Sequence, residues 1–213
     1  MKEELVKDWS LGYIMEHWIR VVSIVVLVFT GIYIHTPFIA GGPDSTIMAT
    51  TRFFHFVAAY TIILGLVVRV YMAFKSTFDA DWKDFSIIEN LKNVPDVLGY
   101  YLFIKGSHKE YRKYNPLQAF AYLFTGLMII FTALTGAALY HGKLFGLITA
   151  PDSFRWVSCF LGGESYTRIW HIIAMWYFII FMLIHVYLAI SITLINKDRT
   201  LSSIFTGYKL KKH

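Results

Sequence analysis

The stretch RIWHIIAMWYFIIFMLIHVY, residues 168–187, decides the fold of this chain. It is apolar and long enough to form a helix that crosses a membrane, yet it contains His171 and His185, fourteen residues apart. Fourteen helical residues rise about 21 Å and complete nearly four turns, so both imidazoles leave roughly the same face at different depths. Ionisable side chains at such depths are costly and indicate a functional site.

The composition of the whole chain agrees with a membrane setting. Of its 213 residues, 56% are hydrophobic and 16% are charged, and the mean hydropathy is +0.52. Four runs reach the roughly 20 residues needed to cross the hydrocarbon of a bilayer, and they cover residues 13–34, 51–74, 117–140 and 169–195. We therefore predict an all-α integral membrane protein, with residues 1–213 forming a single membrane domain built as a four-helix transmembrane bundle.

Lysine and arginine predict the orientation of this bundle. They gather in the N-terminal tail, in residues 75–115 and in the tail after the fourth span, whereas the connection after the first span has none. Cytoplasmic segments are enriched in these residues, so we expect both termini and residues 75–115 in the cytoplasm. The same bias accounts for the net charge of +6. No basic patch with interleaved aromatic residues indicates nucleic-acid binding.

The first apolar run and the cysteine content add two further expectations. The run is longer than the apolar region of a signal peptide and lacks a small-residue cleavage site, so we expect it to stay as a membrane anchor. Cys159 is the single cysteine and cannot form an intramolecular disulfide. One cysteine also cannot supply the thiolates of an iron–sulfur cluster or a nickel site.

Two more histidines lie early in the first and second spans, His17 in MEHWIRVV and His55 in RFFHFVAAY. The second and fourth spans both run inward, which places His55 and His171 near the outer face. His17 and His185 each lie about 15–18 Å of helix from basic residues of the inner face, if the N-terminal tail is helical. Depth therefore pairs His17 with His185 and His55 with His171.

Imidazole is a standard axial ligand of haem iron, so these pairs predict two bis-histidine haems, one near each face. Iron with both axial positions filled by protein is suited to electron transfer without binding a substrate at the metal. The remaining histidines are weaker candidates. We expect His35 at the membrane interface and solvent exposure for His108, His141 and His213.

Four arginines lie near these histidines along the helices. Two of them precede His55 and His171 by three residues, one turn nearer the outer face on the same side. A third lies one turn from His17, and a fourth lies fourteen residues after His55, at the depth of the inner haem. Pairing with a haem propionate would offset part of the free energy that placing a charged arginine in lipid costs. The alternative is that the arginine side chains extend to the lipid headgroups. These candidates are Arg52, Arg168, Arg20 and Arg69.

Three strings resemble a known family. They are HWIRVVSIVVLVFTG (17–31), HIIAMWYFIIFMLIH (171–185) and KYNPLQ (113–118). Together they look like the cytochrome b subunit of membrane-bound, quinone-reactive nickel-iron hydrogenases, in a superfamily shared with formate dehydrogenase cytochrome b subunits. The resemblance covers all four spans. The chain differs from the family's pattern at Ile14 and Ile172, where a basic residue is often found.

This resemblance implies a specific role. Such subunits bind two haems b through ligands that match His17, His55, His171 and His185, in the bacterial cytoplasmic membrane. They accept electrons from the iron–sulfur small subunit of a periplasmic hydrogenase, whose large subunit carries the nickel-iron centre, and deliver them to menaquinone or ubiquinone. The chain would then be an electron-transfer subunit of a hydrogen:quinone oxidoreductase, without a hydrogen-oxidising site of its own.

Several alternatives stay open at this point. The partner could be a formate dehydrogenase or a thiosulfate reductase, or the chain could be a non-redox membrane anchor or a metal transporter. Residues 75–115 contain a patchy amphipathic stretch broken by Pro95 and Gly99, which we expect to form a short helix on the membrane surface. Its apolar residues either cover the bundle or line a quinone pocket.

Overall fold

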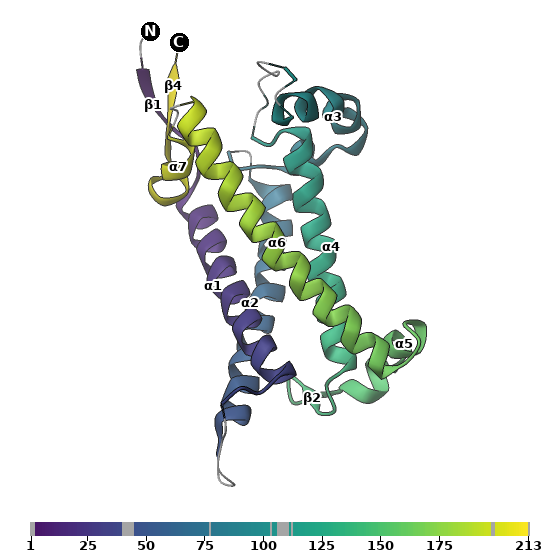
Figure 1. The fold of residues 1–213 in the computed structure, drawn as a ribbon. Coiled ribbons are helices and arrows are strands. Elements are labelled where there is room, and N and C mark those ends of the chain that lie inside the picture. Colours follow the sequence, from purple (N-terminus) through teal and green to yellow (C-terminus); the bar gives the residue numbers. More distant parts are fainter. Residues whose placement is uncertain are drawn as a thin grey trace. The chain divides into compact units, whose positions relative to one another are not determined.

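The computed structural model describes residues 3–39, 45–76, 78–102, 104–105, 111, 113–196 and 199–212. The chain divides into two compact units. Unit 1 comprises Met1–His17, Leu66–Leu127 and Ala189–His213, and unit 2 comprises Trp18–Gly65 and Met128–Leu188. Figure 1 labels most of the elements, which are, in chain order, β1 (Glu3–Lys7), α1 (Leu11–His35), α2 (Ile47–Lys75), η1 (Trp82–Phe85), α3 (Ile87–Tyr101), α4 (Pro116–Ala138), β2 (Lys143–Leu144), β3 (Ile148–Thr149), α5 (Ala150–Phe160), α6 (Glu164–Asn196), α7 (Thr200–Thr206) and β4 (Tyr208–Lys212).

Four helices, α1, α2, α4 and α6, are long and apolar enough to cross a membrane, with mean hydropathies from 1.8 to 2.5 in their most apolar windows. They coincide with the four predicted spans, so the prediction of four membrane-spanning helices is confirmed by length and composition. Large apolar side chains such as Phe29, Phe74 and Leu194 are exposed along them. In water such exposure would be costly, whereas hydrocarbon solvates these side chains.

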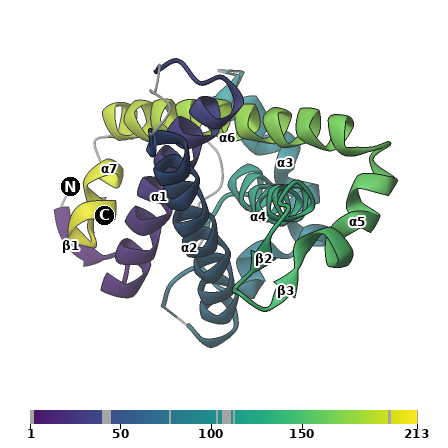
Figure 2. The same ribbon diagram turned by 90° about the horizontal axis from the view of Figure 1, so that it is seen from below.

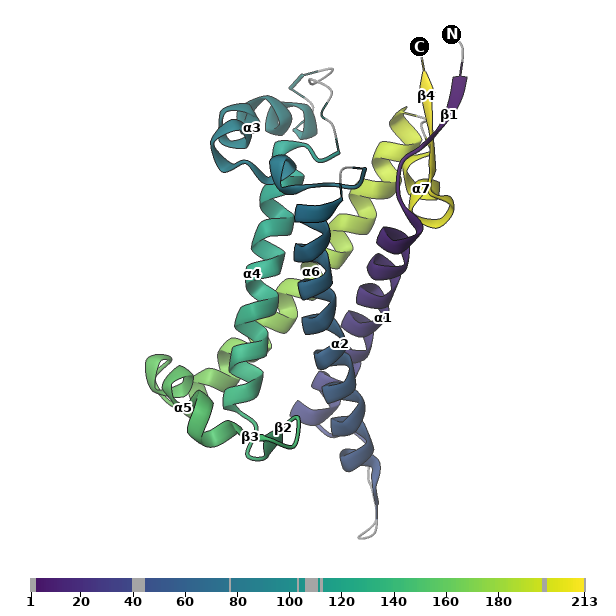
Figure 3. The same cartoon turned by 180° about the vertical axis from the view of Figure 1, so that it is seen from behind.

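The two ends of the chain pair with each other in unit 1, which the sequence did not predict. Strands β1 and β4 form an antiparallel two-stranded sheet, seen beside the N and C labels in Figures 1 and 3. The register sets Leu5 opposite Leu210 and Glu4 opposite Lys211. Cross-strand apolar pairs such as Leu5 and Leu210 stabilise a short sheet. The helical N-terminal tail assumed in the depth estimate for His17 is therefore wrong, because helix α1 begins only at Leu11.

The start of α1 is tied to the end of α2 through Ser10. The Ser10 hydroxyl oxygen accepts a hydrogen bond from the backbone N–H of Tyr13 (3.2 Å), which caps the helix. The Ser10 hydroxyl and backbone N–H both donate to the carboxylate of Asp79, at 2.7 and 2.9 Å. Asp79 is buried, so these bonds compensate for the loss of water around its charge.

The string KYNPLQ (113–118) forms the entry to α4 in unit 1. Asn115 and Gln118 make a reciprocal capping box, with N···O distances of 3.0 and 2.9 Å, and Pro116 occupies the first helical position. Lys113 donates to the backbone oxygen and the carboxylate of Asp8, and the Tyr114 hydroxyl hydrogen-bonds that of Tyr13. The motif therefore starts a membrane helix and joins it to the beginning of the chain.

The described part of residues 75–115 contains two helical pieces. Helix η1 is held by a capping box between Asp81 and Asp84. Helix α3 continues through Pro95 and Gly99, where the sequence indicated a break. Its last residue, Tyr101, accepts a hydrogen bond from the side chain of Asn115 (3.0 Å), and burial raises the pKa of this phenol. Whether α3 lies on a membrane surface stays a prediction.

Unit 2 contains a short hairpin and a helix between α4 and α6. Strands β2 and β3 are joined by a tight turn in which Phe145 and Gly146 have φ angles of 53° and 71°. The Leu147 N–H donates to the Leu144 carbonyl at 3.0 Å and closes this turn. Figure 2 shows the hairpin and α5 beside the end of α4. Two glycines with positive φ, Gly162 and Gly163, then reverse the chain into α6.

We expect Gly207→Ala to lower the unfolding temperature of the purified protein in detergent more than Gly146→Ala. Both glycines have a positive φ, which costs roughly 1–2 kcal/mol for other residues. A Cβ at Gly207 would also lie 3.0 Å from the backbone oxygen of Trp9, whereas a Cβ at Gly146 meets nothing within 4 Å. Intrinsic fluorescence during heating measures both variants, and equal shifts would contradict the packing around Gly207.

Candidate functional site

Two of the predicted ligands, His55 and His171, lie in unit 2 in matching surroundings. His55 of α2 faces α1, where the Thr30 hydroxyl oxygen lies 2.8 Å from the imidazole Nδ1. His171 of α6 faces α4, where the Thr135 hydroxyl oxygen lies 2.9 Å from Nδ1. Thr135 is fully buried. Each imidazole is therefore oriented by a threonine of a neighbouring membrane helix.

A glycine follows each of these threonines and gives the imidazole room. A Cβ built on Gly31 would lie 3.5 Å from the Cε1 atom of His55 and 3.7 Å from the sulfur of Met175 on α6. A Cβ on Gly136 would lie 3.1 Å from the Cε1 atom of His171. At Gly136 even a methyl group would therefore require the imidazole to shift.

The two imidazoles belong to one site. A Cβ built on Gly31 would meet His55 on one side and Met175 on another. Met175 lies one turn after His171 on α6. Unit 2 thus brings together the two histidines that the sequence paired near the outer face.

The other two predicted ligands lie on different units. His17 is half-buried in unit 1, beside the buried Glu16 on α1. His185 is half-buried in unit 2, and its ring stacks on Phe181 with a centroid distance of 5.9 Å and an interplanar angle of 15°. The pairing of His17 with His185 therefore stays a prediction.

Arg69, a predicted propionate partner, is enclosed by aromatic rings in unit 1. Its guanidinium lies 5.5 Å from the ring centroid of Tyr13 and 5.6 Å from that of Phe85. One nitrogen donates to the carbonyl oxygen of Ala80 at 3.2 Å. The other terminal nitrogen, Nη1, is buried and has no hydrogen-bond partner among the described residues. Arg69 thus retains a buried donor for an anionic group.

The predicted arginines in unit 2 have different surroundings. The side chain of Arg168 is 62% exposed, and its Nη2 atom lies 3.4 Å from a carboxylate oxygen of Glu164. Arg52 is exposed, whereas Arg20 is half-buried. An exposed pair such as Arg168 and Glu164 contributes little to stability. The pair borders a cavity of about 550 Å³, which is also lined by His35, Ser165, Ile169 and Ile172.

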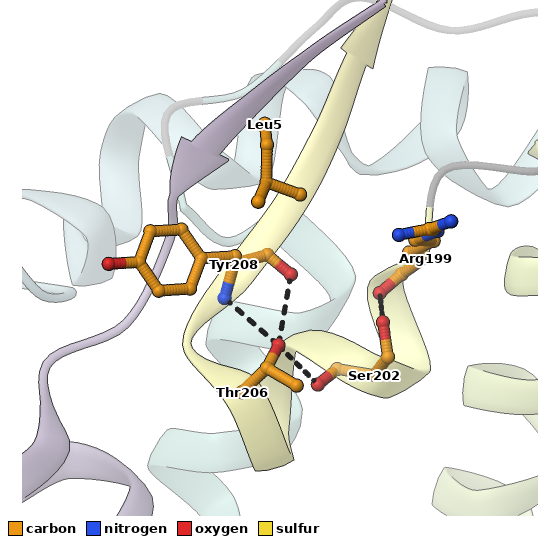
Figure 4. A pocket seen from close by; sticks show the side chains of 5 residues that line it. All are labelled: Leu5, Arg199, Ser202, Thr206 and Tyr208. Carbon is orange, nitrogen blue, oxygen red and sulfur yellow. Dashed lines mark hydrogen bonds between the residues drawn. The ribbon is translucent and has the colours of Figure 1, made fainter.

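Within the described residues, His35 and His141 form no ligand pair with another histidine. His141 lies 3.7 Å from Glu164 and is largely exposed, whereas His108 and His213 lie outside the described residues. A second pocket, in unit 1, is lined by Leu5, Arg199, Ser202, Thr206 and Tyr208 (Figure 4). The hydroxyls of Ser202 and Thr206 donate to backbone oxygens of the pocket itself, to Arg199 at 2.9 Å and to Ser202 at 3.0 Å. None of the predicted site residues lines this second pocket.

Comparison with known proteins decides the family. The family model described as prokaryotic cytochrome b561 matches residues 8–207. The chain belongs to the prokaryotic cytochrome b561 family. It is similar to proteins named "Probable Ni/Fe-hydrogenase B-type cytochrome subunit" from Azotobacter vinelandii, with 30% identity over 99% of this chain and 93% of that protein, and from Cupriavidus necator, with 31% identity over 92% of this chain and 83% of that protein. It is also similar to the "Probable Ni/Fe-hydrogenase 1 B-type cytochrome subunit" of Escherichia coli K12, with 28% identity over 92% of this chain and 87% of that protein.

These relatives confirm the resemblance that the histidine strings indicated. The cytochrome also contains site residues that the sequence reading missed, namely Thr30, Gly31, Thr135 and Gly136. Their only signal in the sequence is a repeated Thr–Gly pair inside an apolar span. The pair recurs at Thr125 and Thr206, so it does not identify the histidine contacts by itself.

Proposed function

We propose that this chain is the di-haem b-type cytochrome subunit of a periplasmic nickel-iron hydrogenase. In this role it anchors the hydrogenase to the bacterial cytoplasmic membrane and passes electrons from the iron–sulfur subunit to the quinone pool. The observation that carries the proposal is the pair His55 and His171, held in one site between membrane helices. The names of the relatives support the hydrogenase as partner.

The residues of unit 2 fit an iron porphyrin between His55 and His171. Imidazoles of two separate helices, α2 and α6, suit the two axial positions, and each has one ring nitrogen occupied by a threonine. Glycines beside both rings leave space that a Cβ would fill. When bound, haem b supplies a one-electron redox couple. The chain supplies the ligands, their orientation and an apolar setting.

For the second haem we propose His17 and His185, the two predicted ligands that remain once His55 and His171 share the outer site. Arg69 supports a charged group nearby, because its buried Nη1 is a free donor that suits a carboxylate such as a propionate. Arg20 is proposed for the same haem. Arg52 and Arg168 are proposed for the propionates of the outer haem, and Arg168 would exchange its contact with Glu164 for that role.

The proposed orientation of the chain is based on its basic residues and on the pairing of its ends. Both termini are proposed to lie in the cytoplasm. The hydrogen-bonded sheet of β1 and β4 supports a common side for the two ends. The outer haem would then face the periplasmic hydrogenase, and the inner haem would be nearer the cytoplasmic surface. The proposed acceptor is menaquinone or ubiquinone.

Addition of hydrogen to membranes that contain the complex should reduce a b-type haem absorption band, and an added quinone analogue should reoxidise it. The physical reason is that the cytochrome connects the iron–sulfur subunit to quinone. Membranes that lack the hydrogenase large subunit are the control and should show no reduction by hydrogen. Copurification with a molybdopterin protein, and reduction by formate in place of hydrogen, would contradict the hydrogenase as partner.

Replacement of single ligands tests the pairing. His171→Ala should eliminate the outer haem and leave much of the inner one, while His185→Ala should do the reverse, because each histidine supplies one axial ligand to one haem. Redox titration of the reduced band distinguishes the two haems by their midpoint potentials. Loss of the same haem in both variants would show that the pairing is wrong.

A further inference from the structure

Two threonines contact His55 and His171, and the hydroxyl hydrogen of each is donated to a backbone carbonyl oxygen of its own helix. The hydroxyl of Thr30 donates to the carbonyl oxygen of Val26, one turn earlier on α1, at 2.6 Å. The hydroxyl of Thr135 lies 3.0 Å from the carbonyl oxygens of both Phe131 and Thr132. A hydroxyl has one hydrogen to donate, and a carbonyl oxygen can only accept. Toward the imidazole, each threonine oxygen is therefore left as an acceptor.

This hydrogen count fixes the tautomer of both imidazoles. With a threonine oxygen as acceptor, the Nδ1 atoms of His55 and His171 must carry the hydrogen, at distances of 2.8 and 2.9 Å. In a neutral imidazole the other nitrogen, Nε2, then has a free lone pair. That nitrogen is the one available to bind iron.

We propose that Thr30 and Thr135 are positioning residues that set the tautomer and the donor strength of the two outer haem ligands, a step that rests on the proposed function. An imidazole that donates its Nδ1 hydrogen gains electron density at Nε2 and becomes a stronger ligand. Stronger donation favours ferric over ferrous iron and lowers the midpoint potential of the haem. The two threonines therefore hold the outer haem at a lower potential than unassisted imidazoles would.

The repetition of this arrangement supports a common purpose. Both threonines bond an i−4 carbonyl on one side and a histidine of the next helix on the other. Both are followed by a glycine that the imidazole overlies. A mere packing role would need the size of the threonine but not its hydroxyl group. Valine has nearly the same shape without a hydroxyl, so Thr→Val separates the two roles.

The test uses the intact complex, purified with both haems, in the variants Thr30→Val, Thr135→Val and Thr135→Ser. Thr61→Val is the matched control, because Thr61 on α2 makes the same i−4 bond, to the Val57 carbonyl at 2.8 Å. Potentiometric titration of the haem band gives the two midpoint potentials. Electron paramagnetic resonance of the ferric haems reports the ligand field independently of activity.

Both Thr→Val variants should shift the potential of the same haem upward and change its resonance signal. The serine variant and Thr61→Val should match the wild type. Loss of that haem in Thr135→Val with its retention in Thr135→Ser also supports the proposal. Unchanged potentials, shifts in two different haems, or equal haem loss in the valine and serine variants would overturn it. Absence of haem from the wild-type chain would instead contradict the proposed function.

Discussion

The rest of the structure depends on one constraint, which is that an imidazole inside a membrane helix must satisfy two ring nitrogens where no water is present. In unit 2 the first nitrogen of His55 and of His171 is satisfied by a threonine of an adjacent helix. The hydrogen bonds leave the second nitrogen as an acceptor without a hydrogen. A metal bound at that atom would complete the arrangement, and the membership in a cytochrome family agrees with such a metal.

Unit 1 surrounds its charged side chains with a different set of contacts. Charged groups there are enclosed by rings and by one another. Lys113 lies 4.7 Å from the ring centroid of Trp9 and also contacts the carboxylate of Asp8, while Arg69 lies between Tyr13 and Phe85. These contacts join the start of α1 to the elements around the end of α2 and the start of α4.

The sequence predicted the features that depend on local pattern. The four spans follow from apolar length, and the pairing of His55 with His171 follows from depth along two helices of the same direction. Features that depend on distant partners were not predictable. The sheet of β1 and β4 joins residues about 200 positions apart. A carboxylate oxygen of Glu164 also lies 3.7 Å from the Nε2 atom of His141, a residue of the segment between α4 and β2.

Two local rules also led to incorrect or incomplete expectations. Pro95 and Gly99 usually interrupt a helix, yet α3 continues through both. Thr–Gly pairs occur at four positions, and two of them contact a histidine only because α1 and α4 lie beside α2 and α6 within unit 2. Which Thr–Gly pair contacts a histidine depends on which helices lie side by side, and a single sequence does not show that.

The most direct measurement of the central claim is the haem content of the purified chain. Conversion of the bound haem to its pyridine complex, together with quantitative amino-acid analysis, gives the number of haems b for each polypeptide. The account predicts two haems b, both low-spin in the ferric state because both axial positions are filled by histidine. A single haem, a high-spin haem or no haem would contradict it.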